Sequence, residues 1–217
     1  MKAQLGFTRR TFAIGVTGVL ALLGLGGASR LVQEKPLTRP PGGQDEDDFI
    51  GACLRCEKCL EVCPAQVIVP ATVEAGFLNT RTPTMNFKLG WCDYCKDYNG
   101  GSPKCVDVCP TAALKLAVDS TPENTIIGKA YIVKDWCLGW QGKGCRICLE
   151  QCPYDAITTD EYSRIRVKYD ACNGCGRCEF VCVSLMSGSY TPGATDRAIT
   201  IKPTQIVDFL LANEVNG

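Results

Sequence analysis

The chain of 217 residues contains no histidine. This absence excludes a Ser–His or Cys–His catalytic pair, a histidine-ligated zinc or Rieske site, and the Cys-x-x-Cys-His attachment of haem. The formal net charge is zero, because 23 basic residues balance 23 acidic ones. The composition therefore gives no indication of a nucleic-acid partner. No catalytic base and no nucleotide-binding loop is found. We therefore predict no catalytic residues and no enzyme activity.

Long apolar runs are equally scarce, and the single candidate lies near the N-terminus. Residues 13–28, AIGVTGVLALLGLGGA, follow a basic flank and fall short of the ~20 residues that a spanning helix needs. The preceding TRRTF, residues 8–12, resembles the twin-arginine export signal, which a receptor reads as an address. Residues 1–28 are therefore predicted to be a twin-arginine signal or, alternatively, a short uncleaved N-terminal anchor. Residues 29–48, rich in Pro, Gly and acidic residues, are predicted to be a polar linker.

What the chain has in abundance is cysteine. Sixteen cysteines form four repeats with none left over, and three of the repeats end in Cys-x3-Cys-Pro, whereas Val183 replaces the proline of the fourth. Repeat 2 carries the insert KDYNGGSPK and repeat 3 the insert LGWQGKG. The repeats comprise Cys53, Cys56, Cys59 and Cys63; Cys92, Cys95, Cys105 and Cys109; Cys137, Cys145, Cys148 and Cys152; and Cys172, Cys175, Cys178 and Cys182.

The spacing of these repeats points to iron–sulfur chemistry. Cys-x2-Cys-x2-Cys-x3-Cys-Pro is the run with which bacterial ferredoxins hold a [4Fe–4S] cluster. A tight loop aims three thiolates at three irons, and the x3 step begins a helix that turns the fourth sulfur towards a neighbouring cluster. Glycines such as Gly174 and Gly176 permit the unusual dihedrals of the loop.

Three other uses of cysteine were weighed. Disulfides are common in small exported proteins, but eight disulfides would not require four copies of one cluster-binding spacing. Structural zinc typically uses two separated cysteine pairs, whereas these repeats pack the cysteines into one loop. Redox-active thiols would not require complete sets of four.

The segments around the repeats predict an α+β fold made of two tandem bacterial-ferredoxin-like modules, each a 2[4Fe–4S] unit. We predict the first module at 49–120, with repeats 1 and 2, and the second at 121–203, with repeats 3 and 4. A C-terminal helix is predicted at 204–217, with Thr204 as its N-cap. DEDDFIGAC, before repeat 1, indicates a helix. Strands are expected, from alternation and β-branching, at 85–92, 112–118, 130–137, 155–160, 164–172 and 197–203.

The cluster-binding repeats and the twin-arginine signal are consistent with each other. Clusters are assembled in the cytoplasm, so a protein that carries them must cross the membrane folded, as the twin-arginine route allows. Ligation would also protect the thiolates in an oxidising compartment. The predicted location is the periplasm or the outer face of the cytoplasmic membrane.

With these motifs the chain resembles the NapG/MauM-type ferredoxin-like proteins, which are periplasmic four-cluster components of quinol dehydrogenase systems. The resemblance covers about 180 residues. It is carried by the twin-arginine signal, RPPGG, FIGACLRCEKCLEVCP, CDYC…CVDVCPTAAL, CLGWQGKGCRICLEQCP and DACNGCGRCEFVCV.

The resemblance implies electron transfer without substrate chemistry. Family members receive electrons from a membrane-embedded quinol-oxidising partner and pass them to a periplasmic reductase or a c-type cytochrome. No small-molecule substrate is expected. The alternative is an electron-transfer subunit of a molybdopterin oxidoreductase.

The resemblance also implies that all sixteen cysteines are iron ligands of four [4Fe–4S] clusters. In ferredoxins the fourth cysteine of one repeat serves the cluster of the other repeat. Two arrangements remain open at this point: repeats 1 with 2 and 3 with 4, or repeats 1 with 4 and 2 with 3. The strands expected around repeats 3 and 4 favour the first arrangement. Its sets are Cys53, Cys56, Cys59 and Cys109; Cys63, Cys92, Cys95 and Cys105; Cys137, Cys145, Cys148 and Cys182; and Cys152, Cys172, Cys175 and Cys178.

Overall fold

A computed structural model describes residues 17–18, 35–97, 101–186, 191 and 193–214. The predicted signal therefore lies outside the described residues, apart from positions 17 and 18. Among the described residues, no helix has both the length and the apolar character needed to cross a membrane. The remaining chain folds into short helices and two-stranded sheets, which confirms the predicted α+β fold class.

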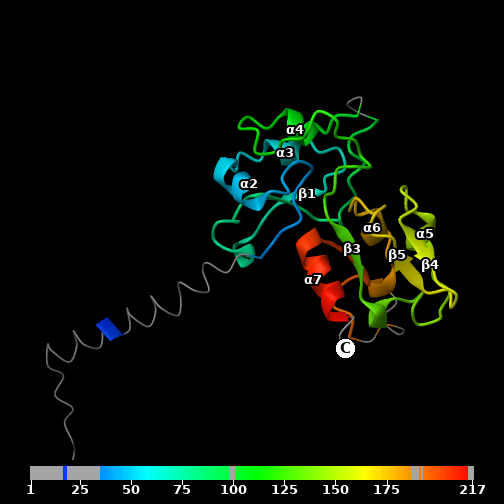
Figure 1. Ribbon diagram of the computed structural model, residues 1–217. Coiled ribbons are helices and arrows are strands. Elements are labelled where there is room, and N and C mark those ends of the chain that lie inside the picture. The colour runs from blue at the N-terminus through cyan, green and yellow to red at the C-terminus, as the bar shows by residue number, and fades with distance from the viewer. Residues whose placement is uncertain (1–16, 19–34, 98–100, 187–190, 192, 215–217) are drawn as a thin grey trace, which may run out of the picture.

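The first module surrounds repeats 1 and 2 and forms the upper part of the folded chain in Figure 1. Strands β1 and β2 pair antiparallel, with Ile68 opposite Met85. Its elements are α2 (Glu46–Ala52), α3 (Lys58–Glu61), β1 (Ile68–Pro70), the 3-10 helix η1 (Val73–Ala75), β2 (Pro83–Met85) and α4 (Lys104–Asp107).

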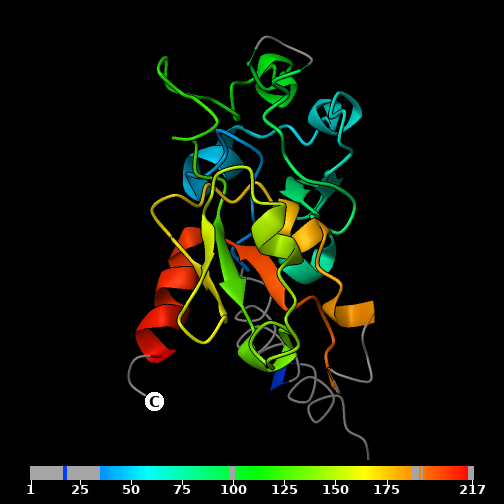
Figure 2. The ribbon, with the colours of Figure 1, turned by 90° about the vertical axis from the view of Figure 1, so that its right-hand side faces the viewer.

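The second module surrounds repeats 3 and 4 and lies below the first in Figure 2. Strand β3 pairs with β6, and β4 pairs with β5, both antiparallel. Its elements are β3 (Lys129–Ile132), η2 (Lys134–Trp136), α5 (Ile147–Glu150), β4 (Ile157–Thr159), β5 (Ile165–Val167), α6 (Arg177–Phe180), η3 (Ser184–Met186) and β6 (Ile199–Lys202). The last helix, α7 (Thr204–Glu214), packs against β3.

The one-turn helices α3, α4, α5 and α6 each hold the third cysteine of a repeat. Two of them begin after a residue with left-handed backbone, Glu57 with φ 63° and Gly176 with φ 85°. The fourth cysteine follows each helix by two positions, and in three repeats a proline comes next, which cannot continue a helix. The repeat spacing thus produces a loop, one helical turn and a stop.

Most predicted elements are present, although shorter than expected. The helical lead-in forms α2, and β3 to β6 lie within or one residue outside the four segments predicted around repeats 3 and 4. Of the segment 85–92, only Met85 belongs to a strand, and β1 was not predicted. Helix α7 begins at Thr204, but the carbonyl of Pro203 accepts its first hydrogen bonds, so the cap lies one residue earlier than predicted.

The strand predicted at 112–118 is wrong. The backbone of this segment curls around a cysteine sulfur, because the N–H of Leu114 donates to Sγ of Cys109 at 3.5 Å. One residue later, the N–H of Lys115 donates to the carbonyl of Gly42 at 3.1 Å. The segment therefore has no strand partner and packs against residues that were predicted to be linker.

The described part of the predicted linker is folded into the first module instead of connecting to it. Arg39 is only 1% exposed. Its guanidinium donates hydrogen bonds to both carboxylate oxygens of Glu46, to Oγ1 of Thr82 at 2.7 Å and to Oδ1 of Asn79 at 2.5 Å. The same guanidinium lies 4.7 Å from the centre of the Phe49 ring. A buried cation is tolerated when several acceptors satisfy it. These contacts therefore hold the segment against the first module, although its polar composition predicts a free linker.

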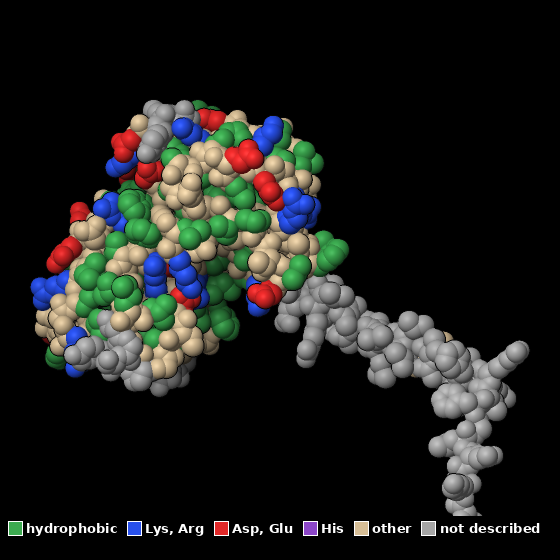
Figure 3. All heavy atoms as spheres, turned by 180° about the vertical axis from the view of Figure 1, so that it is seen from behind, with side chains coloured by type: hydrophobic (Ala, Val, Ile, Leu, Met, Phe, Trp, Pro, Cys, Tyr) green, Lys and Arg blue, Asp and Glu red, His purple; other side chains and the backbone are tan. Residues whose placement is uncertain are grey.

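A single apolar core runs through both modules. It contains Phe49 and Leu114 of the first module and Ile165 and Ile199 of the second. On the face in Figure 3, basic and acidic side chains are interspersed among hydrophobic ones. The shared core holds the four repeats in one body.

Candidate metal centres

The structure groups the cysteines by neighbouring repeats. The fourth cysteine of each repeat joins the first three of its partner, because α3 packs against α4 and α5 against α6. This is the arrangement with repeats 1 and 2 together and repeats 3 and 4 together, and the alternative is not observed. The groups are Cys53, Cys56, Cys59 and Cys109; Cys63, Cys92, Cys95 and Cys105; Cys137, Cys145, Cys148 and Cys182; and Cys152, Cys172, Cys175 and Cys178.

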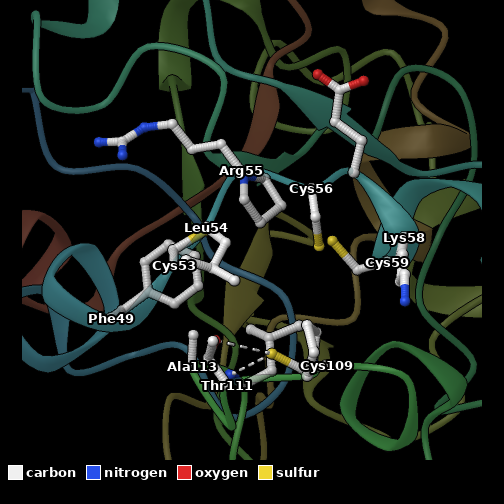
Figure 4. Close-up of a pocket in the computed structure, with 14 residues that line it drawn as sticks. Phe49, Cys53, Leu54, Arg55, Cys56, Lys58, Cys59, Cys109, Thr111 and Ala113 are labelled. Carbon is white, nitrogen blue, oxygen red and sulfur yellow. Dashed lines mark hydrogen bonds between the residues drawn. The ribbon is translucent and has the colours of Figure 1, made fainter.

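Three of these groups line hollows of similar size. The hollows are lined by the groups that contain Cys53, Cys63 and Cys137. Figure 4 shows the first hollow, with the sulfurs of Cys56 and Cys59 facing inward and Cys109 approaching from the opposite side. Apolar side chains complete the walls, which suits a cofactor that must be kept from water.

The geometry fits a polynuclear cluster better than the alternatives. All sixteen cysteines are free, so the structure contains no disulfide. Within the described ranges, no set of three or more His, Cys, Asp or Glu residues converges closely enough to hold one metal ion. Four sulfurs about 2.3 Å from a zinc ion would have to converge in that way. Sulfurs spaced around a hollow instead match a cubane, which offers four separate irons. Ligation by the individual cysteines stays a prediction.

Several buried thiols would hold their protons without a metal. Burial, together with the neighbouring cysteines of each group, raises the pKa of Cys92 and Cys148 to about 12. The same two causes raise the pKa of Cys59 to about 12. Metal binding requires thiolates, so loading must displace these protons.

The pKa of Cys109 shifts downward, because its sulfur accepts several hydrogen bonds. Burial acts to raise its pKa, but the N–H groups of Leu114, Thr111 and Ala113 and the Thr111 hydroxyl outweigh burial and lower it. Figure 4 shows the bonds from Thr111 and Leu114 as dashed lines that meet at the sulfur. Such N–H···S bonds are one of the features that set a cluster's reduction potential. They also explain why the segment after Cys109 cannot form a strand.

One acidic residue beside a predicted ligand was missed by the sequence reasoning. Glu179 follows Cys178 in α6 and is buried, and its Oε2 accepts the N–H of Ile201 at 2.6 Å. Burial raises the pKa of this carboxyl, and Asp196 raises it too, whereas Arg197 lowers it. In the sequence Glu179 looks like any charged residue on a short helix, and only the packing of α6 on β6 buries it.

Comparison with known proteins finds an iron–sulfur family model in each half of the chain. Two models described as "4Fe-4S dicluster domain" match residues 52–114 and 143–185. The chain is 36% identical to the ferredoxin-type protein NapG of Escherichia coli over 158 residues, which are 67% of this chain and 65% of that protein. It therefore spans slightly less than two thirds of that relative's length.

Two further relatives are methylamine utilization ferredoxin-type proteins MauM. The protein from Methylobacillus flagellatus is 30% identical over 83% of this chain and 79% of its own length. The protein from Methylorubrum extorquens is 32% identical over 80% of this chain and 82% of its own length.

Proposed function

This chain belongs to the family of NapG and MauM ferredoxin-type proteins, and from this premise we propose that it relays electrons from a membrane-embedded quinol-oxidising protein to a periplasmic reductase or c-type cytochrome. As a member of this family it is a ferredoxin-type iron–sulfur electron-transfer protein. The proposal extends this to four [4Fe–4S] clusters, one for each group of four cysteines.

The observation that carries the proposal is that the cysteines form four complete groups. Each group would supply one thiolate for each iron of a cubane, and no iron would then keep an open position at which a substrate could bind. The chain has no histidine to act as a base beside such a position. Complete ligation supports electron transfer and argues against substrate chemistry.

The protein's own residues would hold and tune the cofactor. Each bound cluster would supply a reversible one-electron couple. The sixteen cysteines would bind the irons, and side chains such as Phe49 and Leu114 would keep water from the first group. The N–H groups around Cys109 would stabilise negative charge on its sulfur and so shift the potential of that group upward.

Export by the twin-arginine route completes the proposal. The paired Arg9 and Arg10 ahead of an apolar run support it, together with the need to insert clusters before translocation. The protein would then work in the periplasm or at the outer face of the cytoplasmic membrane.

Purification with native partners tests this function. The full chain, tagged at its C-terminus, would be isolated anaerobically from native membranes, and its iron content and co-purifying proteins determined. A polytopic quinol-oxidising protein, with quinol-driven reduction of the clusters, is the expected result. A molybdopterin catalytic subunit would favour the alternative function, and an iron-free protein would refute both.

A further inference from the structure

The two modules touch directly through the cysteine loops of different groups. The N–H of Cys92 donates a hydrogen bond of 2.8 Å to the carbonyl of Cys175. Cys92 belongs to the group with Cys63 in the first module, and Cys175 to the group with Cys152 in the second. We call the contact between residues 87–92 and residues 175–180 the seam. A single hydrogen bond thus joins two predicted ligands of different clusters.

Ring packing brings the two sides of the seam close together. The rings of Trp91 and Phe180 lie 5.2 Å apart, and the guanidinium of Arg177 lies 4.8 Å from the centre of the Trp91 ring. A Cβ at Gly176 would lie 1.8 Å from the nearest atom of the Phe87 ring. With its φ of +85°, this position requires glycine on two grounds, backbone conformation and the approach of the other module.

Charged side chains clamp the same contact. Nη1 of Arg197 donates to the carbonyl of Phe87 at 3.2 Å and to the carbonyl of Glu179 at 2.7 Å, and so holds both sides. Lys88 and Asp196 form an ion pair of 2.8 Å across the modules. The seam is therefore a built contact with polar, aromatic and steric parts.

The cysteines of the two groups that meet at the seam are the more buried ones. These two groups hold five of the six buried cysteines, Cys95, Cys105, Cys172, Cys175 and Cys178. The group with Cys53 includes Cys56, the single exposed cysteine of the sixteen. This pattern is that of a chain of four centres with two inner and two outer members.

We propose that the seam is the junction through which electrons pass between the two modules. The proposal rests on the proposed function. It orders the four groups as those of Cys53, Cys63, Cys152 and Cys137, with partners at the two outer groups. In each passage one inner centre is oxidised by one electron and the other is reduced by the same electron. No bond forms or breaks, and no proton moves.

Two pairs of variants of the full-length, cluster-loaded protein test the junction. Trp91→Leu removes a ring from the seam, and Trp136→Leu is its control, since Trp136 precedes the first cysteine of repeat 3 as Trp91 precedes that of repeat 2. Gly176→Ala forces the modules apart. Its control is Gly144→Ala, which has a positive φ of 70° but no atom within 4 Å of the added Cβ.

The readouts are iron content and electron redistribution after photochemical injection of less than one electron per chain, followed by rapid-freeze EPR. We expect Trp91→Leu and Gly176→Ala to keep wild-type iron and to show a several-fold slower movement of the reduced signal between inner centres. Both controls should match the wild-type rate.

Wild-type redistribution in a fully loaded Trp91→Leu protein would overturn the junction. If Gly176→Ala loses iron, the test rests on the redistribution rate of Trp91→Leu, since this change alters neither a predicted ligand nor the backbone. A wild-type protein without clusters would refute the proposed function instead, so the two failures are distinguishable.

Discussion

Substituting cysteines in pairs shows whether the two residues bind the same cluster or two different clusters. Cys53 and Cys109 belong to one group in the structure, whereas Cys53 and Cys63 belong to two groups although they share a repeat. Cys53→Ala alone should remove one centre of four, a quarter of the iron. The double variant Cys53→Ala/Cys109→Ala should lose the same quarter, because its second change affects a centre already lost. Cys53→Ala/Cys63→Ala should lose half.

The assay is the iron and acid-labile sulfide content per chain after anaerobic purification, with the wild-type protein as the reference. Circular dichroism would show whether the first module still folds. A matched set in the second module, Cys137→Ala with Cys182→Ala or with Cys152→Ala, repeats the comparison at independent groups. If the first module unfolds, all of its variants lose equal amounts of iron. The second set would then still show a loss of a quarter for cysteines of one group and of a half for cysteines of two groups.

The outcomes separate the possible arrangements. A quarter lost from Cys53→Ala/Cys63→Ala would mean that each repeat holds its own cluster, and the grouping derived from the structure would be refuted. A quarter lost from Cys53→Ala/Cys182→Ala would instead indicate that repeats 1 and 4 share clusters. No loss from any of these variants would remove the cluster assignment itself.

Three further predictions concern stability and export. Arg39→Ala leaves buried acceptors unpaired and should lower the free energy of unfolding by about 3–5 kcal/mol, measured by anaerobic denaturant titration. Arg81→Ala breaks a surface pair and should cost at most about 1 kcal/mol, so equal shifts would refute the buried network. Glu179→Gln should raise the denaturant midpoint of unfolding near neutral pH but should leave it unchanged in acid. Burial raises the pKa of the folded carboxyl, so its ionised form destabilises the fold only above the ordinary pKa; a gain that is also present in acid would contradict this. Arg9→Lys with Arg10→Lys should leave the protein in the cytoplasm on cell fractionation, and normal export would remove the targeting proposal.

Several features of the fold follow from local sequence and were predicted. The cysteine spacing sets a loop and one helical turn in each repeat, including repeat 4, in which Val183 replaces the proline. Alternating and β-branched residues identify the segments that contain β3 to β6. The family resemblance, carried by the uneven inserts, agrees with the relatives found by comparison.

The two main errors arise from hydrogen bonds that composition and alternation do not reveal. The segment from Arg39 to Gly43 reads as a polar linker, yet acceptors 40 and more residues away in the chain bury Arg39. The segment after Cys109 alternates like a strand, yet its N–H groups turn towards a sulfur and towards Gly42. The acceptors of Arg39 and the carbonyl of Gly42 lie outside the window from which a local pattern is read. Cys109 lies only five residues before Leu114, and alternation does not reveal that its sulfur accepts N–H groups.

The sequence by itself determined the iron–sulfur chemistry of this protein, because sets of cysteines at ferredoxin spacing set the local loop geometry and predict the type and number of ligands. Only the tertiary structure decided which cysteines stand together, which side chains shield them and where the modules meet. The physical reason is that ligand spacing is a property of a few consecutive residues. The grouping depends instead on how α3 packs on α4 and α5 on α6, and on a glycine at 176 that lets Phe87 approach from the other module.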